Sequence, residues 1–296
     1  KGVILNCSRE ENSDKFWATI GGMGLTGIIL SAKIKLKNIE SAYIRQESIK
    51  AENLNEIFRL FEESEDWTYT VAWIDCLQKG KNIGRSILMR GEHALKVELP
   101  FKLADKPLRL KKKFSPTVPF YFPKFVLNKF TVKAFNFLYF NKQRPKVVKN
   151  IIDYETFFYP LDAINDWNRI YGKSGFIQYQ MVIPKEKGEE GMRRILETIA
   201  NSGQGSFLAV LKLFGKNNPL AYNSFPFEGY TLALDFKLNR ELVQLVNNLD
   251  KIVEEFGGRI YLTKDSMSKS SLTNYLKNVE SSKFTSLQSK RIARGA

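Results

Sequence analysis

The segment GFIQYQMVIP, residues 175–184, constrains the fold more than any other stretch of the chain. The two-residue period of a strand divides it into Phe176, Gln178, Gln180 and Val182 on one side, and Ile177, Tyr179, Met181 and Ile183 on the other. Neither side is suited to solvent, because the only polar groups are two amides among bulky apolar residues. The pattern is typical either of a cavity wall or of a buried strand whose glutamines bond neighbouring backbone.

Three later segments repeat this design. SFLAVLKLFG (206–215) is apolar except for Lys212, and GYTLALDFKL (229–238) gathers Thr231, Ala233 and Asp235 on a small polar side. GGRIYLTKD (257–265) places Lys264 just beyond a strand. Because Lys and Asp are rarely buried without a partner, we expect these four strands to contribute polar side chains to one site.

The amino-acid composition limits the classes of fold and function that the chain can have. The chain has 296 residues, 43% of them hydrophobic, which is enough for a substantial core and more than one lobe. A net charge of +15 favours anionic partners or substrates. Cys7 and Cys76 are too few for a disulfide framework, and no run of about eighteen apolar residues predicts a transmembrane helix. The chain begins at Lys1, inside what reads as a domain, so we expect it to be the C-terminal portion of a longer protein.

A glycine cluster lies near the start, in FWATIGGMGLTGIILSAKIKL (16–36). Its glycines permit left-handed turns and close approach to a ligand, but they match neither a dinucleotide fingerprint nor a P-loop. A structural turn and a ligand loop both fit this pattern. Residues 28–36 are predicted to form a strand.

Elsewhere strands alternate with helices. Apolar residues at helical spacing predict helices at 53–63, 189–200 and 239–256, and a hairpin is predicted around residues 79–82. Trp73 lies within the first strand of this hairpin, where it serves the core or stacks on a ligand. The order strand, helix, strand occurs twice and predicts an α+β fold, with a mostly antiparallel sheet backed by helices.

Residues 99–150 interleave basic and aromatic side chains around five prolines. This composition fits single-stranded nucleic acid, an anionic membrane surface or a solvated loop. Nucleic acid is disfavoured, because the rest of the chain has deep-site strands and none of the usual binding modules.

Five blocks then carry a resemblance to a known family: FWATIGGMGLTGIIL, YTVAWID, FFYPLDAINDWNRIYGKSGFIQYQMVIP, SFLAVLKLFG and GGRIYLTKDS. In this order they resemble the decaprenylphosphoryl-ribose 2′-oxidases, FAD-linked oxidases of the vanillyl-alcohol oxidase superfamily. The resemblance implies the end of an FAD-binding domain at 1–40, a substrate domain at 41–256 and a return to the FAD-binding domain at 257–296.

The resemblance also implies the site residues. Lys264 resembles the catalytic lysine at the flavin and substrate. The substrate-binding residues implied are Gln178, Gln180, Lys212, Asp235, Thr231, Ala233, Phe158 and Trp73, and the cofactor-binding residues are Gly21, Gly22, Gly24, Gly27, Ile29, Tyr261 and Lys264. No metal is implied. Ala233 stands where mycobacterial members carry cysteine, Thr231 where asparagine is common and Phe158 where tyrosine is, which leaves the polarity of the pocket open. His93, the only histidine, lies in no pocket motif and reads as structural.

The implied activity is oxidation of the 2′-hydroxyl of a polyprenyl-phosphoryl ribose to a ketone by FAD. An NAD(P)H-dependent short-chain reductase would complete an epimerisation to arabinose. A bacterial protein peripheral to the inner membrane is implied, with the side undetermined. Two alternatives stay open: a sugar-lactone or alditol oxidase of the same superfamily, whose usual histidine-glycine-lysine motif is missing here, and a non-catalytic lipid or nucleic-acid binding protein.

Overall fold

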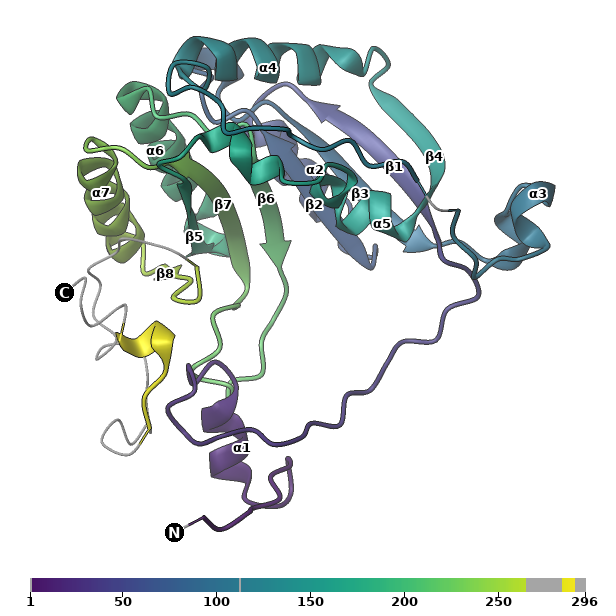
Figure 1. The fold of residues 1–296 in the computed structure, drawn as a ribbon, viewed down its shortest axis with the longest axis vertical. Helices are drawn as coiled ribbons and strands as arrows, with labels where there is room; N and C mark the ends of the chain where they lie inside the picture. Colours follow the sequence, from purple (N-terminus) through teal and green to yellow (C-terminus); the bar gives the residue numbers. More distant parts are fainter. Residues whose placement is uncertain (1, 112, 265–283, 291–296) are drawn as a thin grey trace.

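An eight-stranded antiparallel sheet forms the centre of the molecule (Figure 1). The computed structural model describes residues 2–111, 113–264 and 284–290. The strand order is β4-β1-β3-β2-β6-β7-β5-β8. The strands are β1 (Tyr43–Ala51), β2 (Tyr69–Ile74), β3 (Ser86–His93), β4 (Val147–Asp153), β5 (Phe176–Pro184), β6 (Ala209–Phe214), β7 (Gly229–Lys237) and β8 (Arg259–Ile260). The predicted α+β class, with its antiparallel sheet backed by helices, is confirmed.

The sheet consists of two halves that are each continuous in sequence. Strands β1 to β4 form one half and β5 to β8 the other. The halves join where β2 pairs with β6, through Ala72 opposite Leu211 and Trp73 opposite Val210. The predicted hairpin is confirmed, because β2 and β3 pair antiparallel.

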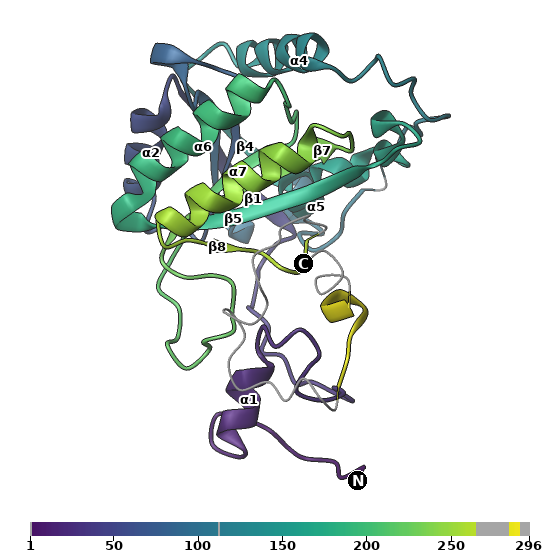
Figure 2. The ribbon, with the colours of Figure 1, turned by 90° about the vertical axis from the view of Figure 1, so that its left-hand side faces the viewer.

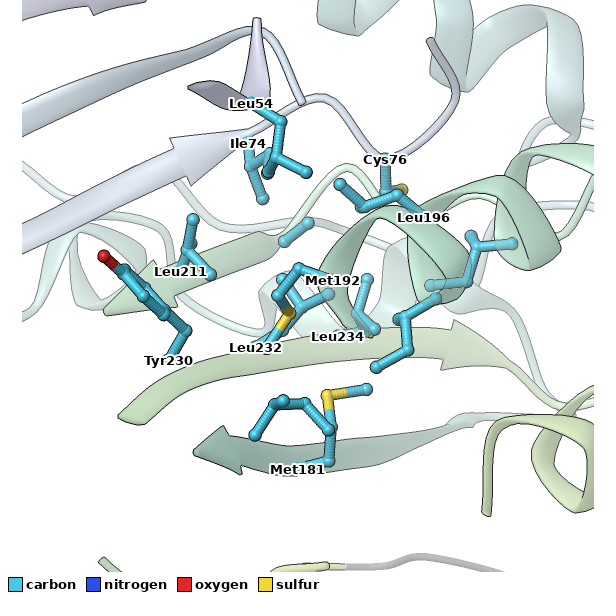
Figure 3. Close-up of a cluster of buried hydrophobic side chains, with 14 of the residues drawn as sticks. Leu54, Ile74, Cys76, Met181, Met192, Leu196, Leu211, Tyr230, Leu232 and Leu234 are labelled. Carbon is cyan, nitrogen blue, oxygen red and sulfur yellow. The ribbon is translucent and has the colours of Figure 1, made fainter. Parts of the chain in front are cut away.

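Three helices cover one side of the sheet, which we call the helix face. They are α2 (Leu54–Glu62), α6 (Gly188–Ser202) and α7 (Leu242–Glu255), so all three predicted helices are confirmed. Figure 2 shows α6 and α7 running alongside each other over β5. Each helix turns an apolar stripe toward the sheet, and the resulting core spans both halves (Figure 3). Met181 and Leu232 from the sheet and Met192 and Leu196 from α6 are buried in it.

Local signals set the ends of these helices. The Asn53 side chain accepts a hydrogen bond from the Glu56 backbone N–H at 3.0 Å and so caps the start of α2. Gly203 takes a left-handed conformation (φ 72°) at the end of α6, where other residues would be strained.

The opposite side of the sheet, the polar face, carries Gln178, Gln180 and Asp235. It is covered more sparsely, by α4 (Lys129–Lys142) and α5 (Tyr154–Phe158). Phe140 of α4 packs on Trp73 and Ile87 of the sheet. The remaining short helices are α1 (Ser13–Thr19), α3 (Phe101–Ala104) and 3₁₀ turns at Gly80–Asn82, Lys96–Glu98, Pro160–Ala163, Trp167–Tyr171 and Lys185–Lys187.

The predicted strand at 28–36 is wrong. This stretch is extended but pairs with no strand among the described residues, and its apolar side chains are open, with Ile28 80% and Leu36 81% exposed. An alternating sequence sets which side each residue faces, but a strand also needs a neighbouring backbone to bond. The predicted boundaries at 40 and 257 stay a prediction, and residues 265–283 and 291–296 of the predicted return segment lie outside the described residues.

Candidate functional site

Strand register gathers the predicted polar residues on the polar face. Gln178 of β5 lies opposite Asp235 of β7, and Gln180 lies opposite Ala233. Thr231 of β7 lies opposite Lys212 of β6. Residues directly opposite in an antiparallel pair share one face. These six residues therefore form one cluster across three neighbouring strands.

Lys264 joins the cluster from the chain that follows β8. The Tyr261 backbone N–H donates to the Gln180 carbonyl at 2.8 Å, and the Lys264 N–H donates to the Tyr261 carbonyl at 3.0 Å. This tight turn brings the chain back over β5, where Lys264 Nζ donates to Gln178 Oε1 at 3.2 Å. The Lys264 ammonium is thus held beside the Gln178 amide and near the Asp235 carboxylate.

Asp235 is the buried acid of the cluster, with 5% of its surface exposed. Burial raises its pKa to about 6, against the opposing effects of a hydrogen bond from the Gln178 side chain and the nearby Lys264 charge. Gln178 therefore links the two charged groups, since its oxygen accepts from Lys264 while its amide donates to Asp235. A carboxyl group with a pKa near neutrality can both accept and return a proton at physiological pH.

The rest of the cluster is fixed to different degrees. Thr231 is buried, donates its hydroxyl to the Met181 carbonyl at 2.8 Å and accepts from Gln180 Nε2 at 3.1 Å. Lys212 is an exposed residue, yet desolvation by the protein around its side chain and the nearby Lys264 charge lower its pKa. Two cations facing one cluster favour a ligand that carries or develops negative charge.

Trp73 and Phe158 lie apart from each other on the polar face. Trp73 is buried next to Val210, its Nε1 donates to the Phe207 carbonyl at 3.1 Å, and Tyr139 of α4 packs on its ring at 4.7 Å. Phe158, at the end of α5, packs edge-on against Tyr69 at 4.9 Å, near the opposite end of β2. Trp73 therefore borders the cluster, whereas the contacts of Phe158 are with the aromatic residues of the neighbouring half-sheet.

Some of the predicted cofactor residues lie against the connection between β6 and β7. Tyr261 stacks on Phe225 at 4.5 Å, within the connection between β6 and β7. The same connection holds the glycine cluster, because Asn223 donates to the Ala18 carbonyl at 3.1 Å, and a Cβ on Gly21 would lie 2.1 Å from the Asn223 oxygen (Figure 1). Gly22 is also closely packed, whereas Gly24 contacts Ser286, Gly27 has open space around it and Ile29 is 69% exposed.

Sequence reasoning missed residues that support the cluster from outside its strands. Tyr171 is 1% exposed, its hydroxyl has no hydrogen-bond partner within the described part of the chain, and burial together with the Asp235 charge raises its pKa. The Ser206 hydroxyl accepts from the Asp235 backbone N–H at 3.2 Å. Ser206 is the first residue of the segment 206–215, but the apolar pattern of that segment does not mark it as a partner of Asp235. Tyr171 lies outside any periodic segment, and only the motif WNRIYG signalled its neighbourhood.

Comparison with curated proteins finds relatives that align with most of this chain. No protein-family model matches it. It is 41% identical over 260 residues to decaprenylphosphoryl-beta-D-ribose oxidase from Mycolicibacterium smegmatis, a match that covers 86% of this chain and 55% of that protein. It is 26% identical over 260 residues to an uncharacterized protein in the mprA 5′ region of Streptomyces coelicolor, covering 85% of this chain and 70% of that one.

Among solved structures, a VAO-type flavoprotein from Myceliophthora thermophila C1 aligns with a TM-score of 0.48 and 12% identity, over 99% of this chain and 52% of that one. The chain thus spans about half the length of the ribose oxidase that it matches. The family resemblance predicted from its motifs is confirmed: by sequence, the chain is a relative of decaprenylphosphoryl-beta-D-ribose oxidase.

Proposed function

We propose that this chain is the substrate-binding part of an FAD-dependent oxidase that converts the 2′-hydroxyl of a polyprenyl-phosphoryl ribose to a ketone. The observation that carries the proposal is the joining of Lys264 and Asp235 through Gln178 on the polar face of the sheet. The 41% identity to the ribose oxidase supports the choice of substrate.

The donor set fits the ring end of a flavin. Lys264 and the amides of Gln178 and Gln180 supply hydrogen-bond donors on one side of an apolar surface, and Tyr261 lies beside them on the stack with Phe225. Bound FAD supplies the hydride acceptor for oxidation of an alcohol carbon. The Lys264 ammonium would hold the negative charge that this transfer creates, a role for which a fixed cation in a site of low polarity is well suited.

Asp235 is our candidate for the group that receives the hydroxyl proton. Its carboxylate is buried, it is oriented by the Gln178 amide, and its pKa of about 6 leaves it mainly ionised at neutral pH. Lys212, at the open edge of the cluster, would bind the phosphate of the substrate. The ketone produced must be reduced on the opposite face to complete an epimerisation to arabinose, which calls for an NAD(P)H-dependent reductase as a partner.

The experiment is anaerobic reduction of the full-length protein with FAD bound. Polyprenyl-phosphoryl ribose should bleach the visible flavin absorbance in the native protein, and the keto sugar should be trapped by borotritide in equal amount. Lys251→Ala, which alters an exposed lysine of α7, is the matched control for Lys264→Ala. Bleaching by sugar lactones or alditols with none by the lipid-linked pentose would instead support the lactone or alditol oxidase. Retained ligand binding, with no flavin reduction by any of these compounds, would support a non-catalytic binding protein.

A further inference from the structure

Helix α4 buries only one narrow row of its side chains. Val132, Asn136 and Phe140 are buried at a spacing of four, and every other residue of the helix is exposed. The exposed positions include Phe130 at 72%, Phe137 at 57% and Leu138 at 67%. Large apolar side chains on a helix normally face the core. On the outer face of α4 they are exposed instead, with no other helix or strand of the described chain packed over them.

The buried row fixes the direction in which the outer face points. Asn136 Nδ2 donates to Asp75 Oδ1 at 2.7 Å, and the same fully buried carboxylate accepts from Arg85 at 2.8 Å. The ring of Phe140 lies close to two cations, with Lys50 Nζ at 4.1 Å and Arg85 Cζ at 5.0 Å from its centroid. Rolling the helix to bury Phe137 would break these contacts and deprive the buried Asp75 carboxylate of its hydrogen bond from Asn136, so the exposure is built into the fold.

Positive charge surrounds the exposed face. Residues 96–149 hold fourteen Lys or Arg and two acidic residues, which makes this segment the source of most of the net charge of +15. Lys129 and Lys133 are exposed on α4 itself, and Lys129 Nζ lies 5.1 Å from the ring centroid of Phe130. The chain entering the helix continues the pattern, with Lys124 next to Phe125, which is 77% exposed.

This combination matches an anionic lipid surface better than the other anionic or apolar partners. A second copy of the chain would bring the same excess of positive charge to the contact and be repelled. A nucleic-acid strand would stack on aromatic rings but would gain little from the aliphatic Leu138. At a lipid interface, aromatic and aliphatic side chains enter the headgroup region while lysines pair with acidic headgroups.

The position of α4 suits contact with a flat surface. Both views place the helix along an outer edge of the molecule, away from α1 and the N-terminus (Figures 1 and 2). No helix within residues 2–111, 113–264 and 284–290 has the length and apolarity to cross a membrane, so the contact would be with the surface.

We propose that the outer face of α4, formed by Phe130, Phe137 and Leu138 with Lys129 and Lys133, binds the surface of an anionic membrane. The same helix places Tyr139 on Trp73 at the border of the polar cluster. If the proposed function holds, this contact sets the site next to the layer that contains a polyprenyl-linked substrate. Membrane binding itself is measured without substrate, so it can fail or succeed independently of the oxidase activity.

The experiment is flotation of the full-length protein with vesicles of phosphatidylglycerol and phosphatidylcholine, compared with phosphatidylcholine alone. The native protein should bind the anionic vesicles and release them as salt rises. The double change Phe130→Ser and Phe137→Ser should weaken binding about tenfold or more. Lys129→Glu with Lys133→Glu should weaken it at least about 25-fold, from about fivefold for each lysine lost.

The matched controls alter exposed residues elsewhere. Lys251→Glu with Lys187→Glu makes the same change in net charge, and Val243→Ser removes an exposed apolar side chain from α7; each should bind nearly as tightly as the native protein. If the Lys251→Glu, Lys187→Glu control lost vesicle binding as strongly as the α4 lysine variant, net charge alone would drive binding and the proposal would be overturned. Absence of binding to anionic vesicles, or a shift to self-association or oligonucleotide binding through the same residues, would overturn it as well.

A second measurement does not depend on variants that lose binding. Phe137→Trp introduces a reporter on the outer face, and its fluorescence should be quenched by vesicles with brominated acyl chains. The native protein supplies the baseline from its four tryptophans. Quenching no greater than this baseline, in a protein that still floats with the vesicles, would place the contact elsewhere and overturn the proposal.

Discussion

The two faces of the sheet use the same strands for different purposes. On the helix face, Leu232, Leu234 and Phe236 of β7 are fully buried beneath α6 and α7. On the polar face, Thr231 and Asp235 of the same strand are also buried, but each is fixed by polar contacts.

The contrast teaches that burial alone does not separate core from site. Burial of apolar area on the helix face stabilises the fold. Holding an acid and a lysine in place on the polar face lowers that stability. Changes on the helix face should therefore lower stability with little effect on chemistry, whereas changes on the polar face should slow the chemistry and leave stability unchanged or raised.

The largest effect on stability is expected from Leu232→Ala. The side chain is fully buried at the centre of the core, and removing it should lower the free energy of unfolding by about 2–5 kcal/mol. Urea denaturation measures this change, with Val243→Ala on the exposed side of α7 as the control. Specific activity per folded molecule should stay near that of the native protein. A loss of activity as large as that from changes on the polar face would contradict the separation of the two faces.

Lys264→Ala should produce the converse result. Removing a cation that stabilises developing charge should slow flavin reduction about 10²- to 10³-fold. The unfolding free energy should change little, because the Lys264 side chain is only half-buried. Stopped-flow reduction and urea denaturation on the same sample separate the two quantities, and an unchanged rate would remove Lys264 from the mechanism.

Asp235→Asn should make the pH dependence of stability less steep. The pKa of Asp235 is raised in the folded protein from its ordinary value of 3.8 to about 6. Its contribution to stability is therefore fully present below about pH 4 and is lost as pH rises through 6. Above that range the variant should be more stable than the native protein by about 2–3 kcal/mol, and below pH 4 the difference should vanish.

Unfolding free energies at a series of pH values test this. Asp66→Asn, at an exposed acid outside the cluster, is the control. A native protein that gained stability relative to the variant as pH rose from 4 to 7 would show that the pKa is lowered instead.

Tyr171→Phe should have the smallest effect. The hydroxyl is buried without a hydrogen-bond partner among the described residues, so its removal should leave stability unchanged or raise it by up to about 1 kcal/mol. Thermal unfolding measures this, with Tyr179→Phe as the contrast on the helix face. That hydroxyl donates to Asp250 Oδ1 at 2.7 Å, and its loss should destabilise the protein. A clear destabilisation by Tyr171→Phe would show that its hydroxyl has a partner.

The sequence was most informative where alternation was strong. The two-sided pattern of residues 175–184 predicted β5, and the isolated polar residues Lys212 and Asp235 predicted the strands that meet it. Register was not predictable, because alternation sets the side on which Gln178 lies but not which residue lies opposite. Residues 28–36 show the same limit, since their alternation was read as a strand that has no neighbour to bond.

Helix α4 was missed for a different reason. Its apolar residues lie all around the helix, so residues 129–142 show no contrast between a buried side and a solvated side. Tyr171 was missed because burial next to Asp235 depends on contacts between segments about sixty residues apart. The roles assigned to Lys264, Tyr261 and the glycines stay predictions that rest on the family resemblance.

The two halves of the sheet are joined through two residue pairs between β2 and β6, and this junction has a consequence for the order of folding. The half-sheet of β1 to β4 is complete once residue 153 has been synthesised, whereas its partner half needs the chain as far as residue 260. We expect the halves to behave as separate cooperative units during synthesis, with the first emerging from the ribosome well before the second. Trp73 and Val210 meet only when the units dock. The polar cluster gains its aromatic border in that last step, so the nascent protein acquires its binding surface late.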